Sequence, residues 1–314
     1  MICPNFKPKS HNKMHIDLIG FPMDLGADRR GVGMGAAALR IAGIRDRLTA
    51  LGYSVDDLGD VLVPNREDQA VDNPKLKFLP QIVSASQRLA QLVENALIRS
   101  HLPLCLGGDH SIALGSIAGL AAACKRKGLT PGLIWIDAHP DVNSDQTTPS
   151  GNIHGMALSA SMGLGHQDLV QFYGPGPKIA PENCALVGVR SIDPLEKQNI
   201  RELGTQVYTM TDIDRQGIGA VIGQALDRMI GRVDCLHVSF DLDSLDPAVA
   251  PGVGTPVPGG LTYREAHLIM ESVAETGLIS SMDVAEVNPV LDVKNQSAEA
   301  AAKIVASCLG KRIL

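Results

Sequence analysis

One short stretch of the chain combines an apolar segment with three polar residues whose types and spacing suit metal chemistry. The apolar residues 132–136 run into Asp137, His139 and Asp141, which occupy alternate positions. Such an ending is typical of a buried parallel strand at its carboxyl end, where open α/β sheets bind their ligands. The three side chains are therefore candidate ligands for a cation, and the alternative is an ordinary strand followed by a solvated turn.

Three other apolar segments end in chemically similar turns. Residues 103–106 lead through two glycines to His110, residues 235–240 lead to Asp241 and Asp243, and residues 278–284 lead to Glu286. If these strands are parallel, their carboxyl ends gather two histidines and several carboxylates on one rim. Carboxylates that are crowded in this way repel one another unless cations neutralise them.

The size of this ligand set favours two cations over one. The candidate ligands are His110, Asp137, His139, Asp141, Asp241 and Asp243, which is too many for a single tetrahedral site. Aspartate can bridge two ions that lie about 3.5–4 Å apart. Oxygen and imidazole ligands without thiolate favour Mn(II), with Fe(II), Co(II) and Ni(II) as alternatives. Water between two such ions becomes a nucleophile near neutral pH, which predicts hydrolysis of a poorly electrophilic carbon.

Further candidates for catalysis follow the same stretch. The polar loop 143–154 ends in His154, whose imidazole could relay a proton to a leaving group, although a histidine in a loop is often only a surface residue. Glu286 could receive a planar guanidinium through a bidentate contact, or it could form a buried ion pair. Asp193 and Glu196 follow another predicted strand, and on their own they indicate a helix start. Four other histidines are interpreted as structural, namely His101, His166, His237 and His267.

Apolar runs alternate with helical patterns along the whole chain. The predicted strands are residues 15–21, 53–57, 103–106, 132–137, 184–189, 206–210, 235–241 and 278–284. The predicted helices are residues 36–51, 81–100, 111–126, 155–162, 194–203, 212–230, 263–276 and 297–308. Thr262 and Glu265 predict a capping box, and Gly52 and Gly277 predict helix ends. The alternation predicts a parallel sheet covered by helices, and it leaves open whether that sheet is an open layer or a closed barrel.

The composition disfavours several other classes of protein. A net charge of −6 over 314 residues offers no basic surface for nucleic acid or an anionic membrane. No run approaches the roughly 18 apolar residues of a spanning helix. Residues 1–13 are polar and lack the apolar core of a secretory signal, so we expect a loose arm there and a single domain over residues 14–314. The six cysteines are scattered, which predicts reduced thiols in a cytoplasmic protein.

One glycine-rich segment imitates a dinucleotide-binding motif. Gly31, Gly33 and Ala36 match the pattern G-x-G-x-x-A, and acidic residues follow about twenty positions later. The pattern requires a strand directly before it, whereas the first predicted strand ends near Phe21. We therefore interpret these glycines as part of a long first loop.

With these motifs in place, the chain resembles the ureohydrolase family, and within it the arginases. The resemblance runs from about residue 15 to the end and rests on GGDHS at 107–111, DAHxD at 137–141, SFDxDxxDP at 239–247 and EVNP at 286–289. It implies a three-layer α/β/α fold around a mostly parallel eight-stranded sheet, and a centre of two Mn²⁺ ions per subunit. By this resemblance His110 and Asp141 complete the ligands of one ion, His139 and Asp243 those of the other, and Asp137 and Asp241 bridge both.

Two loops are more similar to those of arginases than to those of agmatinases. They are SGNIHG at 150–155, together with Asn143, and GTPVPGGLTYRE at 254–265. The resemblance implies that Asn143, Thr148 and Ser150 donate to the α-carboxylate of arginine, that Asp193 and Glu196 take its α-ammonium, and that Thr255 lines the guanidinium end beside Glu286. Pro140 and Asp145 depart from the family's usual pattern, and neither is a candidate ligand.

The resemblance implies hydrolysis of L-arginine to L-ornithine and urea. A hydroxide bridging the two ions would attack the guanidinium carbon, Asp141 would steady it, and His154 would aid proton transfer to the leaving group. One alternative is a sister enzyme that acts on agmatine, guanidinobutyrate or formiminoglutamate. Another is a non-catalytic metal-binding protein on the same fold. The family also implies a homo-oligomer, either a trimer or a hexamer.

Overall fold

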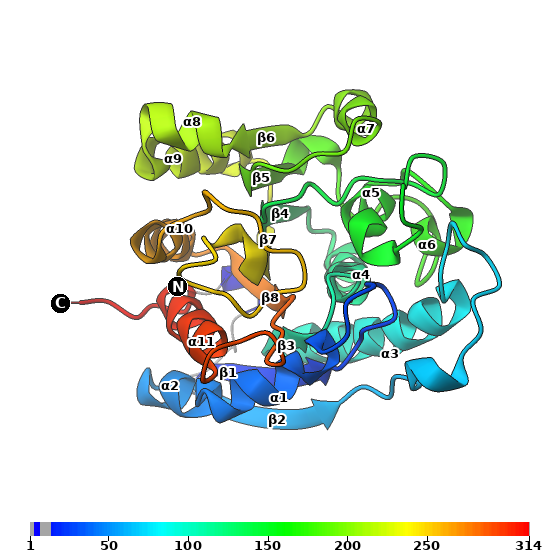
Figure 1. Ribbon diagram of the computed structural model, residues 1–314. Helices are drawn as coiled ribbons and strands as arrows, with labels where there is room; N and C mark the ends of the chain where they lie inside the picture. Colours follow the sequence, from blue (N-terminus) through cyan, green and yellow to red (C-terminus); the bar gives the residue numbers. More distant parts are fainter. Residues whose placement is uncertain (1–2, 7–13, 314) are drawn as a thin grey trace.

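The computed structural model describes residues 3–6 and 14–313, and its centre is one eight-stranded parallel sheet (Figure 1). The strands are β1 His15–Phe21, β2 Ser54–Asp60, β3 Leu102–Gly107, β4 Pro131–Ile136, β5 Cys184–Val189, β6 Gln206–Thr209, β7 Cys235–Asp241 and β8 Ile279–Ala285. They lie in the order β2-β1-β3-β8-β7-β4-β5-β6, and every neighbouring pair is parallel. The predicted strands are thus confirmed, and the sheet is an open layer rather than a barrel.

Helices cover both faces of the sheet (Figure 1). One face carries α1 Gly35–Ile41, α2 Ile44–Ala50, α8 Met210–Gln216, α9 Ile218–Met229, α10 Tyr263–Thr276 and α11 Gln296–Cys308. The other face carries α3 Leu79–Ile98, α4 Ile112–Lys127, α5 Ala157–Ser161, α6 Gln167–Val170 and α7 Glu196–Leu203. The two apolar cores lie between these layers and the sheet. Within the described ranges, none of the helices has the length and apolarity needed to cross a bilayer.

The helix boundaries follow local signals, and two of the predicted helices are each divided in two. Thr262 and Glu265 form the predicted capping box of α10, and Gly277 ends that helix in the left-handed region. The predicted helix 36–51 is divided into α1 and α2 by Gly43, whose φ is 75°. The predicted helix 212–230 is likewise divided into α8 and α9 by Gly217, whose φ is 79°. A glycine adopts positive φ without steric cost, so each redirects the chain where continuous periodicity predicted one helix.

The first residues correct one expectation from the sequence. Cys3 and Phe6 are buried, and the backbone N–H of Cys3 donates to the carbonyl of Ile279 over 2.9 Å. The thiol of Cys3 also lies 2.9 Å from the carbonyl of Asp234. Residues 3–6 therefore pack beside the amino ends of β7 and β8, because two apolar side chains interrupt the polar run there. The rest of the expected arm, residues 1–2 and 7–13, lies outside the described residues.

Candidate metal centre and active site

The site lies where the four central strands of the sheet end. These strands, β3, β8, β7 and β4, are direct neighbours. His110 follows β3, Glu286 follows β8, Asp241 ends β7, and Asp137 follows β4. Because all four strands run in the same direction, their carboxyl ends bring these side chains to one rim. The strand order therefore explains how residues up to 176 positions apart come into contact.

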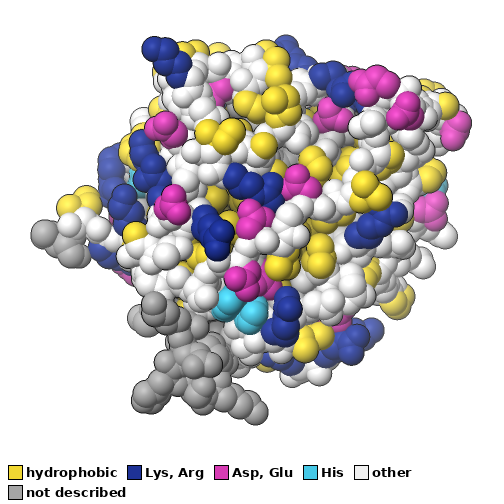
Figure 2. All heavy atoms as spheres, turned by 90° about the horizontal axis from the view of Figure 1, so that it is seen from below, with side chains coloured by type: hydrophobic (Ala, Val, Ile, Leu, Met, Phe, Trp, Pro, Cys, Tyr) yellow, Lys and Arg dark blue, Asp and Glu magenta, His cyan; other side chains and the backbone are white. Residues whose placement is uncertain are grey.

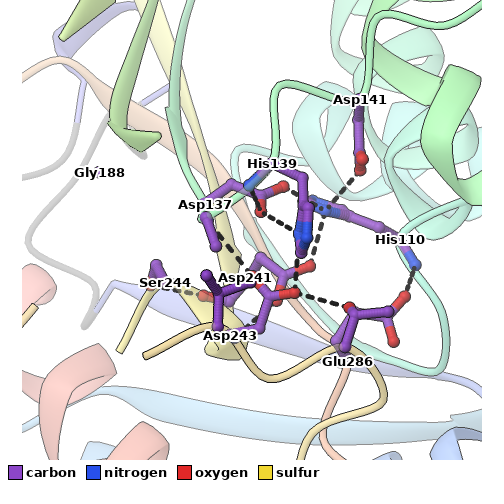
Figure 3. Close-up of polar contacts among 12 residues, drawn as sticks. His110, Asp137, His139, Asp141, Gly188, Asp241, Asp243, Ser244 and Glu286 are labelled. Carbon is purple, nitrogen blue, oxygen red and sulfur yellow. Dashed lines mark hydrogen bonds and ion pairs between the residues drawn. The ribbon is translucent and has the colours of Figure 1, made fainter. Parts of the chain in front are cut away.

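A first group of ligand atoms surrounds the imidazole of His110 (Figure 3). Its Nδ1 lies 2.9 Å from Asp241 Oδ2, 3.1 Å from Asp137 Oδ2 and 3.1 Å from Asp141 Oδ2. The imidazole is fully buried, and none of these oxygens is in line for a regular hydrogen bond with Nδ1. A buried nitrogen that faces three carboxylate oxygens without a hydrogen bond has the surroundings of a metal ligand.

A second group lies beside the first and shares Asp137 with it. His139 Nδ1 lies 3.0 Å from Asp243 Oδ2 and 3.6 Å from Asp137 Oδ1. The two oxygens of Asp137 thus face different histidines. Ligand atoms of His110, Asp137 and Asp241 lie within 4.8 Å of one another, and so do those of Asp137, His139 and Asp243. Figure 3 shows the carboxylates of Asp137, Asp241 and Asp243 gathered at the two imidazoles. The donor set fits two neighbouring divalent cations.

The buried carboxylates of the rim repel one another, and added positive charge would relieve this repulsion. Burial, followed by repulsion from Asp243 and Asp137, raises the pKa of Asp241 well above its usual range. Burial and the charge of Asp137 also raise the pKa of Asp243. Burial would lower the pKa of His110, but its contacts with the carboxylates raise that pKa well above its usual range. A divalent cation would relieve the same repulsion without requiring protonated imidazoles.

Two site residues have a backbone conformation that is unusual for residues other than glycine. Asp141 has a φ of 50° and Glu286 a φ of 62°, both in the left-handed region. The carbonyl of Asp141 accepts hydrogen bonds from Leu158 and Ser159, and the N–H of Glu286 donates to the carbonyl of Gly108 over 2.8 Å. Such strain persists where surrounding contacts fix it, and it clusters at functional sites.

A buried hydrogen-bonded network that the sequence analysis missed supports His110 from behind. Its Nε2 lies 2.8 Å from the hydroxyl of Ser239, which donates to Asp283 Oδ1 over 2.6 Å. The other oxygen of Asp283 lies 2.8 Å from His237 Nε2. The ring of Trp135 stacks on His110 with centroids 4.0 Å apart. These contacts fix the ring orientation of His110, as supporting groups do for metal-binding histidines.

His154 lies beside Glu286, and the two form a partly buried ion pair. His154 Nδ1 is 3.0 Å from Glu286 Oε1, and the same oxygen accepts the backbone N–H of His110 over 2.9 Å. Burial would lower the pKa of His154, but Glu286 raises it to about 9. Gly254 lies next to Glu286, since an added Cβ there would be 3.1 Å from Oε2. The structure thus shows the ion pair that the sequence analysis gave as the alternative role of Glu286.

A cavity of about 120 Å³ opens onto the two ligand groups. It is lined by His139, Asp141, Asn143, Thr148, Ser150, Asn152, His154, Gly155, Ser191, Asp193, Glu196, Asp241, Asp243 and Thr255. The structure therefore brings together all the predicted substrate-binding residues except Glu286, which lies behind His154 and is not part of the lining. Asn152 and Ser191 were not predicted. Ser191 follows β5, so the strand-end argument could have found it.

Contacts within the cavity wall orient several of these residues. Asn143 Nδ2 donates to Asp193 Oδ2 over 3.0 Å. Glu196 accepts the backbone N–H groups of Val142 and Asp193, and burial followed by the charge of Asp141 raises its pKa to about 8. Thr255 was expected at the guanidinium end, and its hydroxyl donates to Asp243 Oδ2 over 2.8 Å. Thr255 therefore connects the cavity wall to a candidate metal ligand.

Comparisons with known proteins agree with this geometry. The model of the arginase family matches residues 14–310. An arginase of Bacillus caldovelox is 48% identical over 300 residues, which cover 95% of this chain and 99% of that protein. An arginase of Bacillus subtilis (strain 168) is 48% identical over 299 residues, with the same coverage. The solved structure of the Bacillus caldovelox arginase matches with a TM-score of 0.91 over 96% of this chain and all of that one.

Proposed function

The chain belongs to the arginase family, and from this premise we propose that it hydrolyses L-arginine to L-ornithine and urea. The observation that carries the proposal is a cavity lined by two kinds of side chain. Candidate metal ligands from both groups line it, and so do amide, hydroxyl and carboxylate groups suited to an α-amino acid. A bound substrate would place its head group at the amide, hydroxyl and carboxylate groups and its guanidinium beside the metal ligands.

Two divalent metal ions, which we propose to be Mn²⁺, fit the six candidate ligands. His110 and Asp141 would bind one ion, His139 and Asp243 the other, and Asp137 and Asp241 both. The shared position of Asp137 and the buried, unpartnered Nδ1 of His110 support this assignment. Two bound ions would lower the pKa of a water molecule between them, which supplies a nucleophile near neutral pH.

Side chains of the cavity would orient the attacking water and protonate the leaving group. Asp141 lines the cavity beside His110, so its carboxylate would accept a hydrogen bond from the attacking water and orient it. His154 Nδ1 is held by Glu286, which leaves Nε2 to carry the proton that the departing amine of ornithine requires. The negative charge of Glu286 would keep this imidazole protonated.

The other lining residues of the cavity would recognise the amino-acid head group. The amide of Asn143 and the hydroxyls of Thr148 and Ser150 can donate to an α-carboxylate. The carboxylates of Asp193 and Glu196 can accept from an α-ammonium. Agmatine lacks the α-carboxylate, so it would leave these donor groups unpaired.

The proposal also covers the oligomeric state of the protein and its cellular compartment. We propose a homo-oligomer, because several apolar side chains are exposed, among them Val290, Leu291 and Val293. The six cysteines are buried and form no disulfide among the described residues, which supports a reducing compartment such as the cytoplasm. Light scattering in solution would then give a mass that is a multiple of the 33.2 kDa chain.

An assay of urea release tests the proposed function. Protein reconstituted with Mn²⁺ would be given L-arginine, agmatine, guanidinobutyrate and formiminoglutamate, with kcat/KM measured for each. We expect L-arginine to be preferred over agmatine by on the order of 10⁴, since buried polar groups reject a substrate that leaves them unpaired. Absence of urea from L-arginine would refute the proposal, and faster agmatine turnover would favour the sister enzyme. Metal binding without turnover of any substrate would favour a non-catalytic protein.

A further inference from the structure

A second group of possible metal ligands lies at the opposite end of the sheet from the candidate metal centre. His15 and Asp17 belong to the start of β1, Asp56 belongs to β2, and His101 directly precedes β3. Strand β1 pairs with β2 on one side and with β3 on the other, so the three segments are neighbours. Figure 2 views the molecule from the edge that carries β1 and β2, and it shows histidine side chains beside acidic and basic ones. The sequence analysis interpreted His101 as structural.

The ligand atoms of this group converge. His101 Nδ1 lies 3.0 Å from Asp17 Oδ1, and His15 Nε2 lies 3.7 Å from the same oxygen. His15 Nε2 also lies 2.8 Å from Asp56 Oδ2. The ring centroids of the two histidines are 4.1 Å apart. One nitrogen from each imidazole and one oxygen from Asp17 thus lie within 4.8 Å of one another.

These distances suit coordination by one ion. Ligand atoms at about 2.1 Å from a tetrahedral metal are about 3.4 Å apart. The separations of 3.0 and 3.7 Å from Asp17 Oδ1 bracket that value. Two imidazoles with a carboxylate oxygen are a ligand set typical of Zn²⁺ and neighbouring transition metals.

Arg99 orients the carboxylate of Asp17. Its Nη2 binds Asp17 Oδ2 over 2.9 Å, so the other oxygen, Oδ1, is left to face the imidazoles. Asp17 itself is buried, whereas the two histidines are about one quarter exposed. A buried carboxylate held by an arginine cannot turn away, and the exposed edges of the rings leave an entry path for an ion. A carboxylate fixed in this way orients its free oxygen, as supporting groups do for metal ligands.

We propose that His15 Nε2, His101 Nδ1 and Asp17 Oδ1 bind one divalent transition metal ion of the Zn²⁺ class. The ion would tie β1 to the α3–β3 turn at the amino end of the sheet. With strands that rise about 3.3 Å per residue, the length of β3 separates this site from the candidate metal centre by roughly 20 Å. Its role is therefore structural, and it does not depend on the proposed function.

The test counts metal ions per chain. Protein loaded with Mn²⁺ would be incubated with a small excess of ZnCl₂ and freed of unbound metal by gel filtration. Its Mn and Zn contents would then be measured by inductively coupled plasma mass spectrometry. We expect three divalent ions per chain in the wild type and two in His101→Gln and in His15→Gln. The total count is used because it is unaffected if Zn²⁺ replaces Mn²⁺ at the other site.

Two controls accompany the count. His166→Gln removes an exposed imidazole elsewhere, so it should retain all three ions. Urea release from L-arginine should stay within twofold of wild type in both His15→Gln and His101→Gln, and Zn²⁺ should raise the Tm of the wild type by more than that of either variant. Equal metal counts in the wild type and a correctly folded variant would overturn the proposal, whatever number of ions the candidate metal centre holds. Since the two variants are independent, either one decides the outcome.

Discussion

Single residues set the chemistry of the site through burial. Asp137, Asp241 and Asp243 are almost fully removed from solvent, although each carries a charge when ionised. Burial of a charge is costly unless a partner compensates for it. Here the compensating groups are two imidazoles, and a pair of divalent cations would serve better. The sequence revealed these residues because each lies within a few positions of the end of a predicted strand. It could not reveal the pairing of Glu286 with His154, which depends on contact between distant segments.

The first residue-scale prediction concerns His154. Glu286 raises the pKa of His154 to about 9, so the imidazole is protonated below that pH and loses its proton above it. We expect His154→Asn to lower kcat by about 10²-fold, the lower end of what a general acid contributes, with little change in KM. The fall in kcat above about pH 9 should also be lost. His166→Asn is the control, and a His154→Asn variant with kcat within twofold of wild type would contradict the assigned role.

The second residue-scale prediction concerns Glu196. Its pKa is raised to about 8, first by burial and then by the charge of Asp141, so the carboxylate becomes ionised as the pH rises through that value. The KM for L-arginine should therefore fall between pH 7 and pH 9. Glu196→Gln removes the charge, and at pH 9 we expect its KM to be about 10-fold higher, the loss of one charged hydrogen bond. Steady-state kinetics would show this, and an unchanged KM would rule out contact with the ammonium.

At the scale of elements, the sequence predicted what is periodic and missed what depends on packing. Each strand was found because an apolar run is followed by turn residues. The divisions at Gly43 and Gly217 were missed because helical periodicity continues across both glycines. The placement of β7 and β8 between β3 and β4 was also beyond the residue pattern, because only tertiary packing sets the strand order. That order brings Ser239 and Asp283 behind His110, so the supporting network could not be predicted.

A prediction at this scale compares two glycines in helices. Gly119 of α4 faces α3, where an added Cβ would lie 2.5 Å from the carbonyl of Ala90 and 2.7 Å from Val93 Cβ. Gly223 of α9 has open space around the same position. We expect Gly119→Ala to lower the free energy of unfolding by about 1–3 kcal/mol through overpacking. Gly223→Ala should raise it by about 0.5–1 kcal/mol through helix propensity. Urea denaturation measures both, and equal effects would show that α3 and α4 are not closely packed in solution.

At the scale of the whole molecule, the candidate metal centre connects the halves of the sheet. Its ligands follow β3, β7 and β4, which span the middle of the strand order. Ions that bind only the folded protein stabilise it by mass action, by about 2.7 kcal/mol for each site when the free concentration is 100 times Kd. The apolar cores on the two faces stabilise the packing of the helices on the sheet. At the rim, repulsion between the carboxylates opposes folding unless cations are bound.

Removal of metal should therefore lower the stability of the whole chain. We expect protein treated with a chelator to have a Tm lower by at least about 5 °C than the Mn²⁺-loaded protein, since roughly 5 kcal/mol is lost over two sites. Addition of MnCl₂ should restore the Tm, whereas potassium chloride of equal ionic strength should not. Differential scanning calorimetry would detect the change. A Tm that is indifferent to Mn²⁺ would mean that the carboxylates are neutralised by protons alone.

The central claim is that the buried carboxylates and imidazoles of the rim hold two divalent ions. Anomalous diffraction at the manganese edge, from crystals grown with Mn²⁺, tests this claim most directly. The account predicts two neighbouring peaks, one beside His110 and one beside His139, with Asp137 and Asp241 contacting both. A single peak, or no peak among these side chains, would contradict it.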